Sequence, residues 1–407
     1  MAGNILIISS DYTGNGHKSI TNSLLEKFKT YPEITTHVID GFSMGGNMGL
    51  KLGKIYGPIT RNAKELWKLI WDISFRTPSL LKELSRISIH DTFLKTLRAI
   101  KPDVIVSVHP GFVGSVIDIL EQYNINIPLI AIVPDLISIS PLWADKRALY
   151  TICPTYEAKE RCMKFGVPEA KIKVTGFPVR EKFYNAMKPD KDTIPKKEQI
   201  SFLIMSGGEG SGNMGKLAEI LLDNFDCQVR IIAGKNSVLQ RRLENNLKPK
   251  HRDRIELFGF VENVQDLMRA SDIAITRGSP NVIMEAVACN TPLIVTGALP
   301  GQEEENPAFL EKHNLGIVCT DIKKLKDAVI NLIKDDYKNI KQIKSSQKEY
   351  MNPNSARDIA EFIAELPLGN CVNIPDNPKK ISLLEKTNGI ITSTRRFKRK
   401  VKKQMAR

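Results

Sequence analysis

The sequence contains no long hydrophobic run and no pattern of disulfide or zinc cysteines. No apolar segment reaches the roughly 18 residues of a membrane-spanning helix, and the chain enters a strand pattern at Asn4 where a secreted protein would have a signal peptide. The six cysteines are scattered, and no two form a Cys-x-x-Cys pair, which argues against a disulfide framework and a zinc site. These absences predict a protein of the reducing cytoplasm, either soluble or peripherally bound to a membrane.

Two nucleotide-binding signatures are also missing. No Gly-Lys-Ser or Gly-Lys-Thr triplet of a Walker loop occurs, so nucleotide hydrolysis is disfavoured. The first loop reads Gly14-Asn15-Gly16-His17 and lacks the third glycine of a dinucleotide fingerprint. No cluster of metal ligands is visible either, so we expect neither a metal nor another cofactor.

Acidic residues are absent from the end of the chain. The net charge of +14 includes eight Lys or Arg residues between Arg395 and Arg407, so the remainder carries only +6. The run from Arg395 to Lys403 (395–403) is typical of a segment that binds nucleic acid or an anionic membrane, and a solubilising tail is the alternative.

Length and patterning predict two α/β domains. A chain of 407 residues exceeds one ordinary core, and its short apolar runs alternate with helical patterns as in doubly wound parallel sheets. The polar, proline-bearing segment 189–199 is expected to link an N-terminal domain (1–188) to a C-terminal domain (200–366). Residues 367–407 would form the basic tail.

The stretch 271–316 has the pattern of two strand–loop–helix units, and we interpret it as the centre of a nucleotide-sugar site. Ile273 to Thr276 suits a buried strand, and Ser279 followed by Pro280 is typical of a helix start. The free N–H groups of that helix start, together with Arg277, favour an anionic group such as a diphosphate.

Polar side chains follow in both units. Glu285 offers two acceptor oxygens that suit the hydroxyls of a ribose. The second unit has its strand at Leu293 to Thr296, a helix start at Pro307 and a helix stop at Gly316. Such loops lie beyond the carboxyl ends of parallel strands, where ligands bind. The loop of the second unit concentrates donors and acceptors for a hexose, namely Gln302, Glu303 and Asn306.

A glycine-rich loop opens the second domain, after the strand Ile200 to Met205. Gly207, Gly208 and Gly210 lack a Cβ atom, so this loop can bring backbone N–H groups close to a diphosphate. A helix is expected from about Met214, and further strands at Val229 to Ala233 and Ile255 to Phe258.

The first loop places a histidine at the start of a helix. His17 precedes apolar residues at helical spacing: Ile20, Leu24, Leu25 and Phe28. An imidazole at a helix start tends to stay neutral, which is the form that a general base requires. Simple packing of His17 against the loop is the alternative.

Two further strands end in polar side chains, and one helix is broadly apolar. His109 ends the strand after Lys101-Pro102-Asp103, and Asp135 follows the strand Pro128 to Val133, both at the functional edge of a parallel sheet. Asp135 would orient the base or touch an acceptor hydroxyl, with a solvated loop carboxylate as the alternative. Trp67 and Trp71 lie on the helical pattern Ile59 to Phe75, which suits a core or a membrane-facing surface equally well.

In their order these motifs resemble glycosyltransferase family 28. Glu285-Ala286 and the loop Pro300 to Asn306 (PGQEEEN) are similar to the donor-binding half of that family, and Thr175 to Arg180 (TGFPVR) to its exit from the first domain. The opening Ser9 to His17 (SSDYTGNGH) is similar to the diacylglycerol-sugar branch, the monogalactosyldiacylglycerol synthases and processive diacylglycerol glucosyltransferases.

The chain departs from the family pattern at two places. Arg277 stands where a lysine is usual, with Ser279 and Asn281 for usual glycines. The segment after Val133-Pro134-Asp135 reads Ser140-Pro141 before Trp143, so the histidine of that motif is missing. The phosphate geometry and the role of the missing histidine therefore do not carry over.

The resemblance implies a GT-B fold, with two Rossmann-like domains facing each other across a cleft. Residues 1–188 would form the acceptor-binding domain and residues 200–366 the nucleotide-sugar-binding domain. The reaction would be an inverting transfer of a hexose from a UDP-sugar to a lipid hydroxyl. The acceptor would be diacylglycerol or a glycosyl-diacylglycerol at the inner face of the cell membrane. It also implies that His17 is the base, that Phe260-Val261 belong to a uracil-binding turn, and that the Trp67 and Trp71 helix, with His109, serves the acceptor side.

Three alternatives remain open from the sequence. Within the family, the acceptor could be polyprenyl-linked, with UDP-N-acetylglucosamine as the donor. An NAD-dependent oxidoreductase would share the α/β pattern but needs the full fingerprint. A nucleic-acid-binding protein would explain the tail, although no aromatic-basic motif accompanies it. We therefore expect the run 395–403 to bind an anionic membrane surface, and we expect no nucleic acid as a partner.

Overall fold

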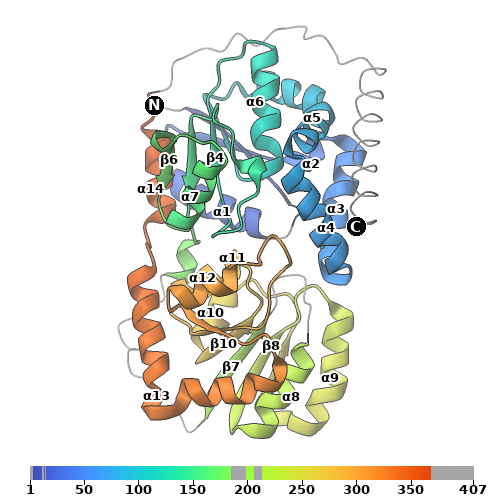
Figure 1. The fold of residues 1–407 in the computed structure, drawn as a ribbon, viewed down its shortest axis with the longest axis vertical. Coiled ribbons are helices and arrows are strands. Elements are labelled where there is room, and N and C mark those ends of the chain that lie inside the picture. The colour runs from blue at the N-terminus through green and yellow to red at the C-terminus, as the bar shows by residue number, and fades with distance from the viewer. Residues whose placement is uncertain (1–2, 12, 14, 185–198, 206–212, 368–407) are drawn as a thin grey trace. The chain divides into compact units, whose positions relative to one another are not determined.

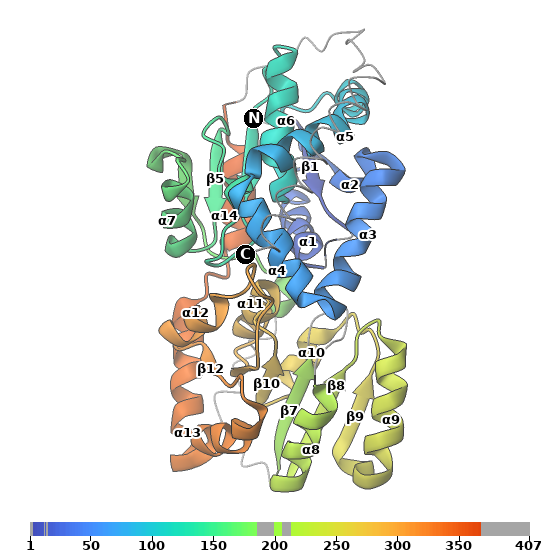
Figure 2. The same ribbon diagram turned by 45° about the vertical axis from the view of Figure 1, so that its right-hand side comes forward.

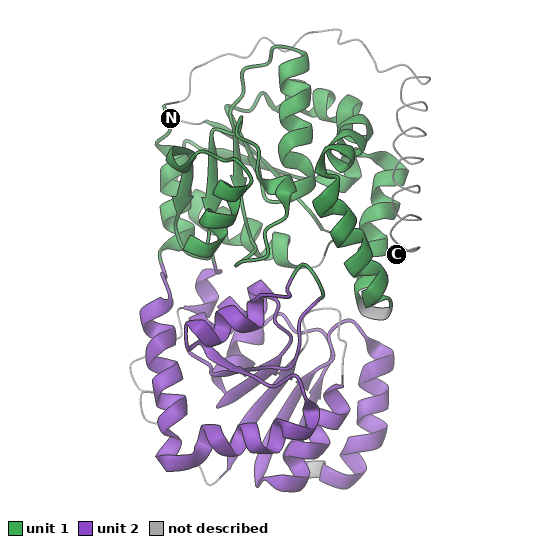
Figure 3. Ribbon diagram, in the orientation of Figure 1, with its two compact units in different colours: residues 1–178, 300–302, 354–407 green, residues 179–299, 303–353 purple. Residues whose placement is uncertain are grey.

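The structure, a computed structural model, describes residues 3–11, 13, 15–184, 199–205 and 213–367. It divides into two compact units (Figure 3). Unit 1 comprises the described residues up to Pro178, Pro300–Gln302 and those from Asn354 onward, and unit 2 comprises those of Val179–Leu299 and Glu303–Pro353. The basic run 395–403 and nearly all of the expected linker 189–199 lie outside the described residues.

Unit 1 is built on a parallel sheet of six strands in the order β2-β1-β3-β4-β5-β6 (Figure 1). The strands are β1 (Asn4–Ser9), β2 (Thr35–Asp40), β3 (Val104–Ser107), β4 (Leu129–Ile132), β5 (Tyr150–Cys153) and β6 (Ile172–Val174). The helices are α1 (Gly16–Phe28), α2 (Gly41–Met44), α3 (Gly46–Asn62), α4 (Lys64–Arg76), α5 (Pro78–Ile100), α6 (Val113–Gln122), α7 (Tyr156–Lys164) and α14 (Ser355–Ala364). Strands β3 and β4 are buried along their whole length, as the continuous apolar runs of central parallel strands require.

Unit 2 repeats this architecture with the strand order β12-β11-β10-β7-β8-β9. The strands are β7 (Ile200–Met205), β8 (Cys227–Ile232), β9 (Ile255–Phe258), β10 (Ile273–Thr276), β11 (Leu293–Val295) and β12 (Gly316–Val318). The helices are α8 (Met214–Asn224), α9 (Ser237–His251), α10 (Val264–Arg269), α11 (Pro280–Ala288), α12 (Asn306–Lys312) and α13 (Leu325–Tyr350). The two sheets confirm the predicted α/β class with a parallel sheet in each half.

The strand order places a topological switch point in each sheet. In unit 1 the chain runs from β1 to β2 on one side and then to β3 on the other, and in unit 2 it leaves β7 for β8 before returning to β10. Loops diverge at such points, so ligands bind there beyond the carboxyl ends of the strands. His17 and His109 follow β1 and β3, and Arg277 follows β10.

The C-terminal helix α14 packs on α1 in unit 1 (Figure 1). Ser355 Oγ at its start donates to the Gly176 carbonyl oxygen at 2.8 Å. Helix α14 buries an apolar face that includes Ile359 and Ile363. The structure groups it with the first half of the chain, whereas the sequence placed it at the end of the segment 200–366.

Two local predictions were wrong. The helical pattern Ile59 to Phe75 is broken at Ala63, whose φ of −139° and ψ of 59° separate α3 from α4. Gly316 does not stop a helix: α12 ends at Lys312, and Asn314 takes the left-handed conformation with φ 50°. Gly316 instead begins β12, where a Cβ would lie 2.6 Å from the Leu293 carbonyl oxygen, so the close approach of two strands requires glycine.

No helix within the described ranges combines the length and apolar character needed to span a bilayer.

Candidate functional site

His17 is the second residue of α1 and is nearly buried. Its Nδ1 lies 2.5 Å from the Val108 carbonyl oxygen. A carbonyl oxygen only accepts hydrogen bonds, so Nδ1 carries the ring hydrogen and Nε2 keeps its lone pair. The group that orients the candidate base is therefore a backbone carbonyl just beyond the end of β3, which no side-chain motif signals.

The imidazole of His17 is held in its neutral form. Burial lowers its pKa from 6.5 to about 4, against the opposing effect of the Val108 hydrogen bond. The sequence attributed neutrality to the helix start, but burial is the larger cause in the structure. A neutral imidazole with a free Nε2 lone pair can accept a proton from a hydroxyl group.

His109 lies beside His17, with 4.8 Å between the ring centroids. The N–H of Gly111 donates to His109 Nδ1 at 3.1 Å, so Nδ1 is unprotonated and the ring hydrogen of the neutral form is on Nε2. Burial, and then the neighbouring His17, hold the pKa of His109 well below its usual value. The switch point of unit 1 thus carries two neutral imidazoles in opposite tautomers.

Asp135 follows β4 and is buried. Its Oδ2 accepts a hydrogen bond from the indole Nε1–H of Trp143 at 3.0 Å. The alternative of a solvated loop carboxylate is therefore wrong, because Asp135 is buried and its carboxylate is bound by the tryptophan eight residues later.

In unit 2, the loops after β10 and β11 are joined to each other. The Nη2 of Arg277 lies 3.3 Å from Oε1 of Glu303, and its Nε lies 3.0 Å from Oε2. Oε2 of Glu303 also accepts from the N–H of Leu299 at 2.9 Å. Both predicted residues are therefore brought together, and Glu303 balances the charge of Arg277.

A second link between these loops uses Asn306 and Gly278. Asn306 Nδ2 donates to the Gly278 carbonyl oxygen at 2.8 Å, and the Gly278 N–H donates to the Gly297 carbonyl oxygen at 2.7 Å. A Cβ on Gly278 would lie 3.3 Å from that Gly297 oxygen, so the missing side chain permits the approach. The Oδ1 of Asn306 is buried and has no hydrogen-bond partner among the described residues.

Helix α11 begins as the sequence predicted, with Ser279 at its N-cap and Pro280 at its first position. The Ser279 side chain makes no capping hydrogen bond, so it leaves the first N–H groups of the helix available to an anion. Glu285 on this helix is buried, and its Oε1 lies 3.6 Å from Nη2 of Arg180. Arg180, at the end of the TGFPVR motif, thereby contacts the carboxylate predicted to bind a ribose.

Only some of the remaining residues predicted to bind the donor sugar nucleotide lie within the described part of the chain. Phe260 is exposed and Val261 is partly exposed just beyond the end of β9, with Lys235 Nζ 5.4 Å from the Phe260 ring centroid. Gln302 is partly exposed in the short piece grouped with unit 1. The predicted residues of the glycine-rich loop lie outside the described residues: Gly207, Gly208 and Gly210.

The two tryptophans of α4 are partly buried in unit 1. Trp67 packs edge-on against Tyr56 with 5.0 Å between ring centroids, and Trp71 lies 6.0 Å from Phe75. Within α3 and α4, the large apolar side chains that are exposed lie instead on α3 and at the start of α4. They are Met48, Leu52, Ile55 and Leu66.

No group of three His, Cys, Asp or Glu side chains in the described part of the chain is placed to hold a metal ion.

Two family models match the chain. The model of monogalactosyldiacylglycerol (MGDG) synthase matches residues 17–179, and that of the glycosyltransferase family 28 C-terminal domain matches residues 209–363. With a six-stranded parallel sheet in each unit, these matches define a glycosyltransferase of the GT-B class. More narrowly, the chain belongs to glycosyltransferase family 28, in its diacylglycerol-sugar branch.

Relatives with an assigned activity match 88% to 89% of the chain. A processive diacylglycerol beta-glucosyltransferase of Bacillus cereus (strain G9842) is 28% identical over 370 residues, which is 88% of this chain and 92% of the relative. A processive diacylglycerol beta-glucosyltransferase of Bacillus thuringiensis (strain Al Hakam) is 27% identical over 374 residues, covering 89% and 93% of the two chains.

Solved structures share the fold at low sequence identity. UDP-GlcNAc 2-epimerase from Neisseria meningitidis, bound to UDP-GlcNAc, superposes with a TM-score of 0.60 at 15% identity, covering 89% of this chain and 100% of that one. MurG of Acinetobacter baumannii gives a TM-score of 0.59 at 11% identity, with 89% and 99% covered. The expected GT-B class is thereby confirmed.

Proposed function

We propose that this glycosyltransferase transfers a hexose from a UDP-sugar to a hydroxyl of diacylglycerol or of a glycosyl-diacylglycerol, with inversion at the anomeric carbon. The observation that carries the proposal is the free lone pair at Nε2 of His17. The Val108 carbonyl oxygen binds Nδ1 of the same ring and so fixes the imidazole at the switch point of unit 1. The names of the relatives, which are processive diacylglycerol beta-glucosyltransferases, support the choice of acceptor and a glucosyl donor.

On the acceptor side, His17 acts as general base. Its Nε2 removes the proton from the acceptor hydroxyl while the oxygen attacks the anomeric carbon on the face opposite the diphosphate. The bond between the anomeric carbon and the diphosphate oxygen breaks, UDP leaves with the electron pair, and the proton held by His17 passes to solvent. Asp135 follows β4, the strand next to β3 in the sheet, and is fixed by Trp143. It helps to hold the acceptor.

On the donor side, unit 2 binds the UDP-sugar. Glu285 accepts hydrogen bonds from the ribose, and Arg180 holds its carboxylate in place. The N–H groups at the start of α11 and the cation of Arg277 stabilise the diphosphate. The linked loops supply the polar groups for the hexose, with Gln302 and Glu303, and the buried, unpaired Oδ1 of Asn306 is one candidate acceptor for a sugar hydroxyl.

Two further parts of the donor proposal rest on sequence position. The turn after β9 brings Phe260 and Val261 to the uracil, which fits their exposure. The glycine loop, with Gly207, Gly208 and Gly210, contributes backbone N–H groups to the diphosphate. No metal takes part in this proposal.

We further propose that the enzyme docks on the inner face of the membrane through α3. Met48, Leu52 and Ile55 are spaced as one face of this helix and are 50%, 57% and 49% exposed. The exposed Lys51 and Lys54 accompany them, and the helix contains no acidic residue. This combination suits an anionic lipid surface. The helix carrying Trp67 and Trp71 follows directly and contacts α3 (Figure 2).

The direct test offers the purified protein radiolabelled UDP-glucose, UDP-galactose or UDP-N-acetylglucosamine with vesicles containing diacylglycerol or a polyprenyl phosphate. We expect a hexosyl-diacylglycerol with the anomeric configuration opposite to that of the donor. Transfer only to the polyprenyl acceptor would favour the alternative within the family. A retained anomeric configuration would exclude the single displacement assigned to His17.

A further inference from the structure

The two imidazoles at the switch point present complementary nitrogens. His17 has its hydrogen on Nδ1, bound to Val108, and a lone pair on Nε2. His109 accepts at Nδ1 from Gly111 and has its hydrogen on Nε2. Among the described residues, neither Nε2 has a hydrogen-bond partner, although the ring centroids are only 4.8 Å apart. One ring therefore offers a proton acceptor and its neighbour a hydrogen-bond donor.

The tautomer of His109 is fixed by a braced residue. The carbonyl oxygen of Gly111 accepts from Ser85 Oγ on α5 and from Ser115 Oγ on α6, each at 2.8 Å. A Cβ on Gly111 would lie 3.3 Å from both Cε1 and Nδ1 of His109, so the glycine lets its backbone approach the ring closely. The N–H of Gly111 is thus held toward Nδ1, which keeps the hydrogen of His109 on Nε2.

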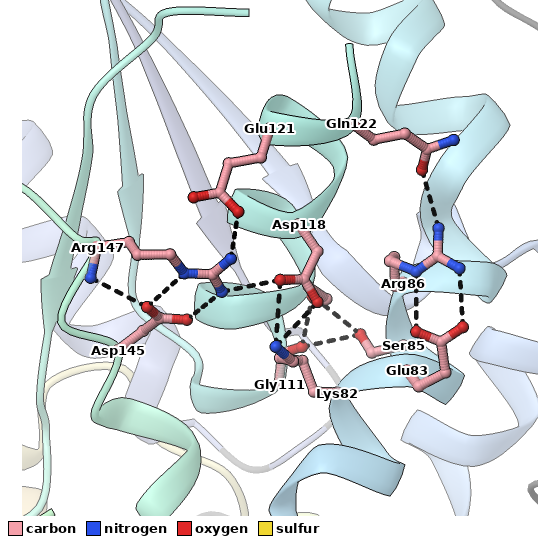
Figure 4. A network of polar contacts seen from close by, with 11 residues as sticks. Lys82, Glu83, Ser85, Arg86, Gly111, Asp118, Glu121, Gln122, Asp145 and Arg147 are labelled. Atoms are coloured by element: carbon pink, nitrogen blue, oxygen red, sulfur yellow. Dashed lines mark hydrogen bonds and ion pairs between the residues drawn. The ribbon is translucent and has the colours of Figure 1, made fainter. Parts of the chain in front are cut away.

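The helices that hold Gly111 are themselves tied together (Figure 4). Lys82 on α5 reaches Asp118 on α6 at 3.0 Å. Arg147 also contacts Asp118, at 2.8 Å, and pairs with Asp145. This group of charges secures α5, α6 and the segment before β5 around the turn 110–112, so His109 is placed by the core of unit 1 and not by a loose loop.

Aromatic packing completes the setting of His109. The Phe42 ring meets it edge-on with centroids 5.1 Å apart, and Phe112 lies at 5.0 Å. This apolar packing disfavours a charged imidazole, in line with the lowered pKa of His109. A neutral His109 does not repel the imidazolium that forms on His17 during the reaction, yet it still donates from Nε2.

We propose that His109 is a catalytic hydrogen-bond donor, whose Nε2–H binds the acceptor oxygen from which His17 Nε2 removes the proton. This inference rests on the proposed transfer reaction. The hydroxyl oxygen has two lone pairs. One accepts from His109, the O–H bond points to His17, and the remaining lone pair attacks the anomeric carbon. As the proton leaves, negative charge grows on this oxygen, and the hydrogen bond from His109 strengthens in the transition state.

Two substitutions separate this role from packing. His109→Phe keeps an aromatic ring against Phe42 and Phe112 but has no donor. His109→Gln loses the ring but keeps an N–H donor at a similar distance from the backbone. Loss of one oriented donor typically costs about 10²- to 10³-fold in turnover. We expect that fall in kcat for His109→Phe, and a fall of no more than about tenfold for His109→Gln, because the donor is retained.

The Kd for UDP is a second readout, which loss of the hydrogen-bond donor at His109 should leave unchanged. The Kd for UDP should equal that of the parent in both variants, because the proposed nucleotide site is in unit 2. A purely structural His109 predicts the reverse order, with His109→Phe more active than His109→Gln, and this order would overturn the proposal.

The tautomers can be measured in the unaltered protein without any turnover. Histidine labelled with 15N should show His17 protonated at Nδ1 and His109 protonated at Nε2 at pH 7. The opposite tautomer at His109 would refute the donor role even if sugar transfer to diacylglycerol is active. A second outcome is that the tautomers are as expected but the protein transfers no sugar to diacylglycerol from any UDP-sugar. That outcome would overturn the proposed function, and the donor role with it.

Discussion

Glu303 and Arg277 form an ion pair that joins the loops after β10 and β11, with Oε2 of Glu303 3.0 Å from Nε of Arg277. The side chain of Glu303 is nearly buried, and that of Arg277 is one-quarter exposed. The pair therefore fixes the relative position of two loops that we assign to the donor site. It also means that Arg277 meets a diphosphate with its charge already balanced in part.

Breaking this pair should destabilise unit 2. Glu303→Gln leaves the partly buried guanidinium of Arg277 without its anion and is expected to lower the free energy of unfolding by about 1 to 3 kcal/mol. The double variant Arg277→Met with Glu303→Gln should lose less unfolding free energy than the two single variants lose in sum. Chemical denaturation of the parent, the two single variants and the double variant would measure these losses.

An exposed ion pair in the same unit provides the control. Lys341 and Asp336 lie 2.7 Å apart but have side chains 53% and 87% exposed. Lys341→Met should change the unfolding free energy by less than about 0.5 kcal/mol, because solvent screens such pairs. Additive losses at Arg277 and Glu303 would show that the two side chains do not stabilise each other.

Glu285→Gln should weaken UDP binding. The substitution replaces one carboxylate oxygen by an N–H donor and removes the charge that faces Arg180. An unmatched buried polar group costs about 1 to 3 kcal/mol, or roughly 5- to 150-fold in Kd. Calorimetric titration with UDP measures the change, and Glu256→Gln, at a half-exposed position on β9, is the matched control. An unaltered Kd for the Glu285 variant would remove Glu285 from the nucleotide site.

The strands of unit 2 show how much the sequence could predict. Strands β7, β9 and β10 have the predicted bounds, and α11 begins at the predicted Pro280. Each depends on local information, either a short apolar run between polar residues or a helix-start pair. Such patterns act within a few residues of the chain, so they can be read without knowledge of the fold.

The polar contacts of the site were not predictable in the same way. The partner of His17 is the carbonyl group of Val108, 91 residues away, and any residue type has a carbonyl group. Glu303 was predicted to face a sugar, but nothing local indicated its contact with Arg277, 26 residues earlier. The break at Ala63 was missed because both flanking segments have helical periodicity. Tertiary contacts decide the surroundings of His17 and Glu303.

His17 should act as a base well below neutral pH. With its pKa near 4, His17 stays unprotonated between pH 7 and pH 5. Protonation of His17 should therefore not lower kcat/KM for the acceptor in that range. An imidazole with the ordinary value would lose about 30-fold by pH 5. His17→Ala should lower turnover about 10²- to 10⁴-fold throughout this pH range while leaving the Kd for UDP unchanged. Turnover within a factor of two of the parent would exclude His17 as the base.

The same burial has a consequence for stability. The pKa of His17 is about 4 in the folded protein and 6.5 as an unperturbed group, so the unfolded chain binds more protons between these values. The free energy of unfolding should therefore decrease as the pH falls from 6.5 to about 4, by up to about 3 kcal/mol for this group. His17→Gln should show a shallower decrease in urea denaturation over this range, and identical slopes would contradict the low pKa.

Membrane docking through α3 predicts two separable contributions. Leu52→Gln with Ile55→Gln removes exposed apolar side chains while keeping good helix formers. Burial of each such side chain contributes about 1.5 to 3 kcal/mol at most, so sedimentation with phosphatidylglycerol vesicles should weaken at both low and high salt. Val238→Gln, which alters a 77% exposed apolar residue on α9, should bind like the parent.

The salt-sensitive contribution is assigned to lysines and to the basic run. Lys51→Gln with Lys54→Gln, or truncation after Thr394 to remove 395–403, should reduce binding at low salt only, because each cation contributes about 1 kcal/mol near an anionic surface and is screened beyond a Debye length. Equal binding of the parent to neutral and anionic vesicles would contradict this half of the proposal. Tight binding to DNA at physiological salt would assign the basic run to nucleic acid.

The apolar contact could instead be made by α4. In that case the Leu52 and Ile55 variant would bind vesicles like the parent, and Trp67→Ala with Trp71→Ala would bind more weakly at high salt.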